Sequence, residues 1–502
     1  MICASNAKEA EMAVIFDPDL IDFPSGSLIA GERLRGSGQH YAVLRPSDGK
    51  VAREERGAGQ DLVDRAVNTA RDSYKTSGWP TSEPRARQRV MRKWADLIDA
   101  HFEELARLEA AVSVRVIGAV RLRDVAMSAE LIRFYGEAID KIEGSVLATR
   151  AGKLSTLVRE PYGVVAAIAP WNTPLLLATL KIAPAIAAGN AIVLKPSELT
   201  PYSIIRLAEL GVEAGLPAGM ISVLPGLGSE TGSALIRHPG VNYVSFTGSA
   251  ATGVQVMCDA AQTGLKPVSL ELGGKSPQLV FADAPDLDRV ADLVAQSVCA
   301  NGGQVCFAGT RLVVERSIEG ELVEKIRTRM QNVTPGPTWD DQTTLAPIAS
   351  ASQAARLEAI LEQAKAGGAE TLEGGGRVEG EPGGIFFAPT ILHKAPPENP
   401  AVRDEIFGPV LTVQPFEDFE EGLALADHPT FGLAGGVHTS NLQKALQAAN
   451  AIQAGTVWVN HFGPNTDPNA PMGGYKQSGF GKDFGVMGLN KFLKTKNIAI
   501  TF

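Results

Sequence analysis

The sequence predicts an α/β protein with two domains, each built on a parallel sheet that helices cover on both faces. At 502 residues, the chain exceeds the size at which one hydrophobic core usually stops growing. Through its middle, short apolar runs alternate with helical segments, and a second such series begins near residue 276. This alternation is typical of βαβ units, whose strands run parallel.

The first part of the chain, from about Asp61 to Ala138, is predicted to be mainly helical. In RQRVMRKWADLIDAHFEELARLEA, apolar residues recur at steps of three and four with charges between them, which indicates amphipathic helices. The following stretch, GKLSTLVREPYGVVAAIAP, combines a β-prone run, a Pro-Tyr-Gly break and an apolar strand. The chain is therefore expected to enter a new sheet there.

The two parallel sheets are predicted from two sets of apolar runs. The first set is GVVAAIAP, NAIVLKP, ISVLPG and NYVSFTG, and the second is SPQLVFADA, TRLVVE and GPVLTVQPF. The Gly- and Glu-rich stretch GGAETLEGGGRVEGEPGG is predicted to form surface turns. The tail KFLKTKNIAITF is β-prone, and as an edge strand it could pair with another subunit.

Composition narrows the classes of partner. The net charge of -9 argues against nucleic-acid binding, which normally needs a basic patch, so a small molecule is favoured. The four cysteines form no CxxC pair and are too few for a disulfide scaffold, so neither a metal site nor an oxidising compartment is expected. We expect a cytoplasmic protein, because the chain shows no signal peptide and no apolar run of about eighteen residues.

Two segments are candidates for nucleotide binding. In VSFTGSAATGVQVM, a strand ends at Thr247, Gly248 and Ser249 and a helix follows, whose N-terminus offers free N–H groups to a phosphate. The alternative is a simple N-cap at Ser249. The segment LPGLGSETGSAL, with Gly228 and Gly232, misses the G-x-G-x-x-G spacing by one residue and is weak evidence.

A ribose site is predicted at Lys195 and Glu198, which follow an apolar strand at the edge where open α/β sheets bind ligands. A carboxylate accepts hydrogen bonds from ribose hydroxyls and repels a 2′-phosphate, so Glu198 favours NAD over NADP. The alternative is a solvated pair of loop residues.

Cys306 is the candidate nucleophile. In NGGQVCFAGTR, small neighbours leave room for a substrate, and a helix or loop amide can lower a thiol pKa. The alternative is a buried cysteine that serves only for packing.

Two further residues could complete the chemistry. Glu271 precedes a Gly-Gly turn and could act as a general base, or else be a surface carboxylate at a strand end. Asn172 lies between a strand and a helix, where its amide could donate to an oxyanion, or else cap the helix.

Taken together, the motifs PWN, KPSE, FTGS, ELGGK, GQVC, EIFGP and GGYKQSG, in this order, resemble the aldehyde dehydrogenase superfamily over essentially the whole chain. The resemblance implies two Rossmann-type α/β domains plus a small β oligomerisation extension. The cofactor-binding domain would comprise residues 1–139 and 163–275, and the catalytic domain residues 276–484. Residues 140–162 and 485–502 would form the extension, which pairs subunits into a homodimer or homotetramer.

The resemblance also implies a mechanism with an aldehyde as substrate and NAD, with NADP as the alternative, as cofactor. Cys306 would form a hemithioacetal whose oxyanion is held by Asn172, and after hydride transfer Glu271 would activate water to hydrolyse the thioester. Lys181 would relay the proton. Cofactor contacts are implied for Ile168, Pro170, Trp171, Lys195, Ser197, Glu198, Gly228, Gly232, Phe246, Thr247, Gly248, Ser249, Leu272, Gly273, Glu405 and Phe407.

The sequence departs from the family pattern in three places. Asp483 stands where many members carry the longer Glu, which puts a second carboxylate of the proton relay in doubt. LARLEAAVSVRVIGAVRLRDV lacks the usual acidic and Gly-Lys pattern, so the loop at the opening of the substrate channel is expected to differ. In NHFGPNTDPNAPMGG, His461 and Phe462 could shape the pocket, the alternative for His461 being a structural hydrogen bond. The sequence does not identify the aldehyde.

Overall fold

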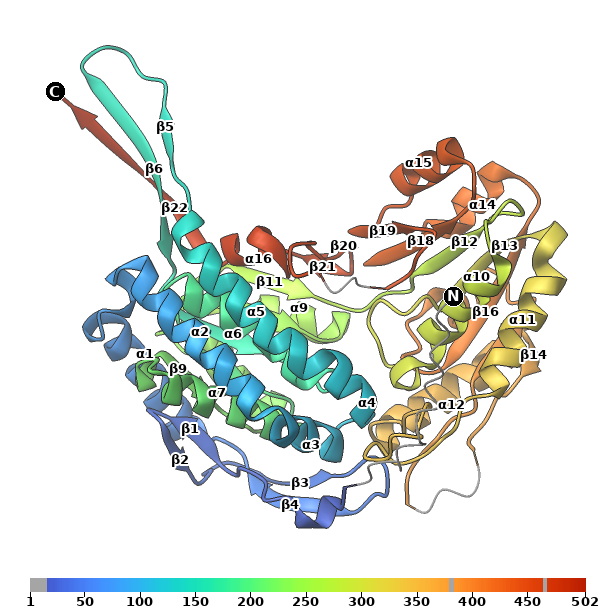
Figure 1. Cartoon of the computed structure of the whole chain (residues 1–502), viewed down its shortest axis with the longest axis horizontal. Helices are drawn as coiled ribbons and strands as arrows, with labels where there is room; N and C mark the ends of the chain where they lie inside the picture. Colours follow the sequence, from blue (N-terminus) through green and yellow to red (C-terminus); the bar gives the residue numbers. More distant parts are fainter. Residues whose placement is uncertain (1–15, 379–382, 464–466) are drawn as a thin grey trace, which may run out of the picture.

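The computed structural model describes residues 16–378, 383–463 and 467–502. Two large sheets dominate it (Figure 1), and the predicted α/β class is confirmed. The first sheet has eight strands in the order β2-β1-β9-β8-β7-β10-β11-β21. Its parallel centre is β7 (Val164–Ile168), β8 (Ala191–Lys195), β9 (Ile221–Val223), β10 (Tyr243–Thr247) and β11 (Val268–Glu271). Antiparallel strands close its edges: β1 (Ser27–Ile29), β2 (Glu32–Leu34) and β21 (Gly479–Phe480).

Helices cover this first sheet, including the segment predicted to be helical. They are α1 (Gln60–Thr76), α2 (Pro84–Ala100), α3 (Phe102–Val112), α4 (Ile117–Ala119), α5 (Ala126–Ala138), α6 (Pro174–Ala187), α7 (Tyr202–Ala214), α8 (Ser233–Arg237) and α9 (Ala250–Gln262). Helix α5 packs against both α2 and α6. Trp94 of α2 is fully buried, and its Nε1 donates to the Leu207 carbonyl at 2.9 Å. Gly211 permits this contact, because a Cβ there would lie 2.8 Å from the indole ring.

The second sheet has seven strands in the order β14-β15-β16-β13-β12-β18-β19. Every pair is parallel except β14 (Glu370–Glu373) with β15 (Thr390–His393). The other strands are β16 (Val410–Phe416), β13 (Arg311–Glu315), β12 (Pro277–Val280), β18 (Ala434–His438) and β19 (Thr456–Val459). Its helices are α10 (Leu287–Cys299), α11 (Glu319–Gln331), α12 (Ala351–Ala366), α14 (Phe419–Ala426) and α15 (Leu442–Ala451).

Strand β14 corrects one prediction, because it lies inside the stretch expected to form only turns. The backbone of Glu370–Glu373 pairs with β15 at the edge of the sheet, while three of its four side chains are exposed. An edge strand with solvent on its side chains tolerates a polar composition, so hydropathy does not reveal it.

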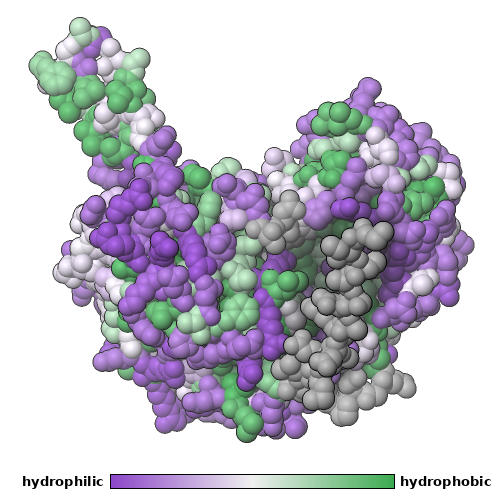
Figure 2. Space-filling model, viewed as in Figure 1, coloured by the Kyte–Doolittle hydropathy of each residue, from purple (hydrophilic) through white to green (hydrophobic). Residues whose placement is uncertain are grey.

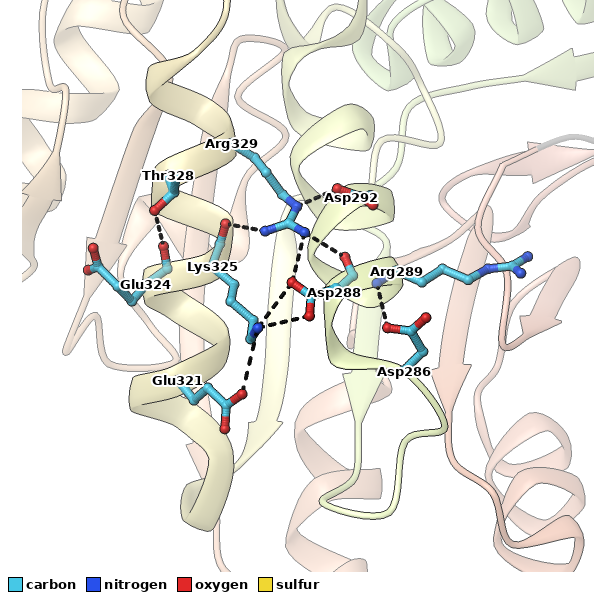
Figure 3. Close-up of polar contacts among 9 residues, drawn as sticks. All are labelled: Asp286, Asp288, Arg289, Asp292, Glu321, Glu324, Lys325, Thr328 and Arg329. Atoms are coloured by element: carbon cyan, nitrogen blue, oxygen red, sulfur yellow. Dashed lines mark hydrogen bonds and ion pairs between the residues drawn. The ribbon is translucent and has the colours of Figure 1, made fainter. Parts of the chain in front are cut away.

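Ion pairs join the outer surfaces of α10 and α11 (Figure 3). Lys325 Nζ lies 3.0 and 2.9 Å from the two carboxylate oxygens of Asp288, and Arg329 donates to both Asp288 and Asp292. Such exposed pairs each contribute little, about 0–1 kcal/mol. Beneath them, buried Val294 and Ile326 belong to one apolar cluster, which fixes α10 firmly to the sheet.

A three-stranded antiparallel arm projects from the first sheet (Figure 1). It comprises β5 (Ser145–Leu147), β6 (Lys153–Pro161) and β22 (Leu493–Thr501), with β6 in the centre. The tail is thus a strand, as predicted. Apolar side chains are displayed along the arm (Figure 2), and those most exposed are Val146, Leu147, Ile498, Ile500 and Phe502.

The remaining elements are short. They are the hairpin of β3 (His40–Leu44) and β4 (Val51–Arg56), the pair of β17 (Phe431–Gly432) and β20 (Tyr475–Lys476), and the helices α13 (Pro400–Arg403) and α16 (Gly485–Asn490). Within the described residues, no helix combines the length and apolarity that a membrane crossing requires. Cys3 lies outside the described residues.

Candidate active site

A cavity of about 350 Å³ brings together eight of the residues singled out in the sequence: Asn172, Thr247, Glu271, Leu272, Cys306, His461, Phe462 and Asp483. Asn172 precedes α6, Thr247 and Glu271 end parallel strands of the first sheet, and Cys306 follows α10. Segments far apart in the chain therefore meet at the carboxyl ends of parallel strands, where open α/β sheets bind ligands.

The loop that presents Cys306 is held rigidly. After α10, Asn301 and Gly302 adopt left-handed conformations, with φ of 58° and 59°. Gly303 passes so close to the Gly408 carbonyl that a Cβ would lie 2.1 Å from it. Buried Gln304 donates from Nε2 to the carbonyls of Asn301 and Pro347, both at 2.9 Å. The thiol is consequently fixed at the cavity wall rather than packed in the core.

The protonation of Cys306 differs from the expectation. Burial raises the pKa of the thiol to about 12, and the nearby carboxylates of Glu405 and Glu271 add to the rise. Backbone N–H groups of Phe307 and Cys306 act in the opposite direction, but less strongly. The prediction of a lowered pKa is thus wrong for the ligand-free chain, because desolvation of the thiolate outweighs the loop amides.

Asn172 lies beside the cysteine loop. Its Nδ2 donates to the Gln304 carbonyl at 3.1 Å, and Asn301 Nδ2 donates to the Asn172 carbonyl at 2.9 Å. The N-cap of α6 is Thr173, so the alternative role of Asn172 as a cap is wrong. A carboxamide carries two hydrogens, and the second one remains available to a ligand.

Glu271 is not a surface carboxylate. Its Oε1 is buried and has no hydrogen-bond partner among the described residues. Burial, reinforced by the negative charge of Asp483, raises the pKa of Glu271 well above its ordinary value. A carboxylate with a raised pKa binds a proton more tightly than an ordinary carboxylate, which suits a general base.

Lys181 is 1% exposed, and the charge of Glu271 acts on it. Its Nζ donates to Ser245 Oγ at 3.3 Å. Burial lowers the pKa of Lys181 to about 8, although the charges of Asp483 and Glu271 act to raise it. An ammonium group with this pKa is able to exchange protons with its neighbours near neutral pH.

Lys491 is a neighbour that the sequence reasoning missed. It follows α16 and forms a close ion pair with Asp483, and the two side chains are only 7% and 8% exposed. Although burial acts to lower it, the Asp483 carboxylate raises the pKa of Lys491. The only signal in the sequence is a lysine eight positions after Asp483. The charges that act on Glu271 are therefore one further carboxylate and three lysines, Lys491, Lys181 and Lys482.

The residues predicted at the ribose site lie together. Lys195, 3% exposed, ends β8 and donates to Glu198 at 3.0 Å, so the alternative of a solvated loop pair is wrong for the lysine. A Cβ at Gly232 would lie 3.8 Å from the Lys195 side chain and 3.9 Å from that of Ile168. Gly232 closes the π-helical turn Gly228–Gly232, and Gly228 has open space beside it. Ser197 lies in the loop that follows β8, where its Oγ accepts from the Leu199 N–H at 3.3 Å.

Ser249 is the N-cap of α9, as the alternative held, and its Oγ accepts from the Thr252 N–H at 3.2 Å. Capping engages one N–H group and leaves others at the first turn of α9 for an anion. Just before the cap, Gly248 faces the Phe246 ring, since a Cβ would lie 2.5 Å from it.

A second group of predicted cofactor residues gathers around Glu405. Its Oε1 accepts from the Gly274 N–H at 3.1 Å, and a Cβ on Gly273 would lie 2.2 Å from the carboxylate. Burial raises the pKa of Glu405 to about 7. Phe407, two residues on, meets the Trp171 ring edge-on with centroids 5.4 Å apart. Trp171 follows Pro170 in the loop after β7.

Two further cavity residues were not given a role in advance. Arg115 and Arg123 reach the cavity from the segment after α3, where the sequence departs from the family pattern. Their only sequence signal is positive charge within an otherwise apolar run. His461 also lines the cavity, and its buried Nε2 has no partner among the described residues, which argues against a structural hydrogen bond through that atom.

The chain resembles known proteins in both sequence and fold. A family model described as "Aldehyde dehydrogenase family" matches residues 34–498. The NADP/NAD-dependent aldehyde dehydrogenase PuuC of Escherichia coli is 42% identical over 451 residues, 90% of either chain. An indole-3-acetaldehyde dehydrogenase solved with NAD+ has a TM-score of 0.94 at 38% identity, covering 97% of this chain and 98% of that one. A gamma-glutamyl-gamma-aminobutyraldehyde dehydrogenase from Burkholderia cenocepacia has a TM-score of 0.94 at 39% identity, covering 96% and 98%.

Proposed function

Because this chain belongs to the aldehyde dehydrogenase family, we propose that it oxidises an aldehyde to a carboxylic acid through a thioester on Cys306. The observation that carries the proposal is the meeting of Cys306, Asn172 and Glu271 in one cavity. A nucleophile, an oxyanion donor and a base are what acyl chemistry on a thiol requires.

The first stage uses the thiol and its neighbours. Because burial holds the pKa of Cys306 at about 12, the thiol must release its proton, to water or to Glu271, as its sulfur bonds to the aldehyde carbon. The negative charge then falls on the former carbonyl oxygen. The Asn172 amide and the Cys306 N–H stabilise that oxyanion, and loss of hydride from the carbon leaves the thioester.

The second stage hydrolyses the thioester. Any proton that Glu271 took from the thiol first leaves through Lys181. Glu271 then accepts a proton from water, the hydroxyl oxygen bonds to the acyl carbon, and the carbon–sulfur bond breaks, which releases the acid and a thiolate that takes up a proton again. The proton passes from Glu271 towards Lys181, whose pKa of about 8 suits a relay, and the Asp483–Lys491 pair adjoins both groups.

We propose NAD, with NADP as the alternative, as the group that accepts the hydride. The residues present fit this cofactor. Lys195 and Glu198 suit a ribose, and the first turn of α9 suits a pyrophosphate. Gly273, which lies close to Glu405, has no side chain that would block the approach of a ligand to the backbone. Glu198 favours NAD because its charge would repel a 2′-phosphate. The relative kcat/KM for NAD and NADP tests this choice.

We also propose that the three predicted units act as cofactor domain, catalytic domain and oligomerisation extension. The apolar side chains exposed on the arm support pairing with a second copy into a homodimer or homotetramer. Light scattering of the full chain and of Ile498→Asp tests this assembly. A cytoplasmic location remains a prediction from the cysteine content.

The decisive experiment mixes the protein with NAD and a reactive aldehyde and follows NADH on the millisecond scale. The proposal expects a burst followed by steady turnover without coenzyme A, and Cys306→Ala should abolish both. Strict dependence on coenzyme A would instead indicate an acylating enzyme, which Glu271 argues against. No NADH with any aldehyde would indicate a protein that keeps the fold for binding alone.

A further inference from the structure

Two arginines stand in the wall of the cavity that holds Cys306. Arg115 donates from Nε to Asp124 Oδ2 at 2.6 Å and from Nη2 to Asp124 Oδ1 at 3.0 Å. The two side chains are 9% and 0% exposed. A bidentate pair satisfies both partners, so Arg115 and Asp124 together carry no net charge.

Arg123 has no such partner among the described residues. Asp124 is the one carboxylate whose charge acts on it, and Arg115 already takes both oxygens of that carboxylate. Burial lowers the pKa of Arg123, but a guanidinium starts above about 12 and stays charged at neutral pH. The cavity wall therefore holds an unpaired positive charge. A charge partly withdrawn from water costs free energy unless it is paired.

The backbone directs this one residue into the cavity. Arg123 lies on the π-helical turn Val120–Val125, between α4 and α5. In the same turn, Leu122 is 85% exposed, and Arg121 is held by Glu103 and Asp341. Of the six residues in the turn, only Arg123 lines the cavity. Such turns frequently occur at functional sites, because the extra residue redirects a side chain.

The rest of the wall offers Arg123 no counter-charge. Two carboxyl groups line the cavity, of which Asp483 is paired with Lys491 and Glu271 is the proposed base. The remaining lining is mostly apolar and includes Leu176, Leu177, Leu180, Leu293, Phe462 and Phe484. His461 adds a second polar group, since its buried Nε2 also has no partner among the described residues.

We propose that Arg123 selects aldehydes that carry a carboxylate at the end remote from the carbonyl, with an aliphatic spacer between the two. This inference rests on the proposed function. The guanidinium donates two parallel hydrogen bonds to a carboxylate, and the leucine side chains accommodate the spacer. The same charge disfavours aldehydes with an ammonium end.

The test compares glutaric semialdehyde with its methyl ester, which differ by one charge. Wild type is expected to favour the carboxylate by about ten- to a hundredfold in kcat/KM, mainly through KM. In Arg123→Gln the ratio should fall to within about threefold of one, while Arg123→Lys should keep part of the preference. Arg121→Gln, on the same turn but outside the cavity, is the matched control and should keep the wild-type ratio.

A readout without turnover separates the two hypotheses. Glutarate should slow alkylation of Cys306 by iodoacetamide in wild type and in Arg121→Gln, but not in Arg123→Gln. A wild-type ratio near one, equal losses with both substrates in Arg123→Gln, or protection that does not depend on Arg123 would overturn the inference. If wild type makes no NADH from either aldehyde while glutarate protection still depends on Arg123, the proposed function fails and the carboxylate site stands.

Discussion

Replacing Lys491 with methionine should destabilise the protein strongly, because it leaves the Asp483 carboxylate buried and unpaired. The two side chains are 7% and 8% exposed, and the carboxylate also feels the charge of Glu271. Breaking a buried ion pair from one side costs about 3–5 kcal/mol. Protonation removes the charge of the carboxylate and therefore limits the loss at pH 7. For an ordinary aspartic acid with a pKa near 3.9, protonation at pH 7 costs about 4 kcal/mol.

The cost of breaking the ion pair and the cost of protonating the carboxylate are similar at pH 7, and the cost of protonation depends on pH. Since each pH unit is worth about 1.4 kcal/mol to a proton-binding group, the penalty should shrink to about 1.5 kcal/mol at pH 5. Urea titrations at one protein concentration, at pH 5 and pH 7, measure this. The double variant Asp483→Asn with Lys491→Met removes both charges and should recover at least half of the loss at pH 7.

Lys325→Met is the matched control, since it removes a lysine from the exposed pairs between α10 and α11 (Figure 3). That change should cost at most about 1 kcal/mol at either pH. The reasoning fails if Lys491→Met costs less than about 1 kcal/mol at pH 7, or if its cost is the same at pH 5.

Three further predictions follow from the site and its surroundings. Glu271→Gln should keep the NADH burst but slow steady turnover by about 10²–10⁴-fold; stopped-flow mixing measures both, and equal losses would contradict the assigned role. Because burial raises the pKa of Cys306 to about 12, alkylation of the ligand-free protein by iodoacetamide should quicken about tenfold per pH unit between pH 7 and 10, whereas a plateau below pH 9 would contradict it. Burial likewise raises the pKa of Glu109 to about 7, so the folded state favours the protonated form and stability falls as pH rises from about 4.5 to 7. Glu109→Gln should remove up to about 3 kcal/mol of that fall, and urea titrations at pH 5 and 7.5 that show the same fall in both proteins would refute it.

The parallel strands β7, β8, β9, β10, β12, β13 and β16 were predictable because each is a short apolar run between helical segments, a pattern that burial on both faces imposes. The parallel strands β11, β15, β18 and β19 were not among the predicted runs. Strand β14 was not predicted either, since its pairing with β15 depends on backbone hydrogen bonds at an edge whose side chains face solvent. Hydropathy records what side chains bury and carries no direct trace of backbone pairing. Edge strands of this kind are therefore where such reasoning falls short.

The functional site was likewise predictable only in part. The positions of Cys306, Asn172 and Glu271 at one cavity agree with what their ordered motifs implied. The electrostatics did not follow, because the thiol pKa depends on desolvation and on Glu405, about a hundred residues away in sequence. Arg123 shows the same limit. Its charge was visible in the sequence, but the pairing of Asp124 with Arg115, which leaves it unanswered, requires the fold.

The structure changes the interpretation of Asp483, because it pairs this carboxylate with Lys491. As a shortened carboxylate it looked like a weakened member of a proton relay, yet Lys491 reaches it across the six-residue helix α16 and the two are buried together. Asp483 and three lysines, Lys491, Lys181 and Lys482, then act on Glu271, and the positive charges favour release of its proton. Because Lys491 acts to lower the pKa of Glu271 while Asp483 acts to raise it, the pair sets the proton affinity of the base as a unit. Replacing either partner should therefore shift the pH profile of thioester hydrolysis. Lys491→Met should shift it to higher pH, and Asp483→Asn should shift it to lower pH.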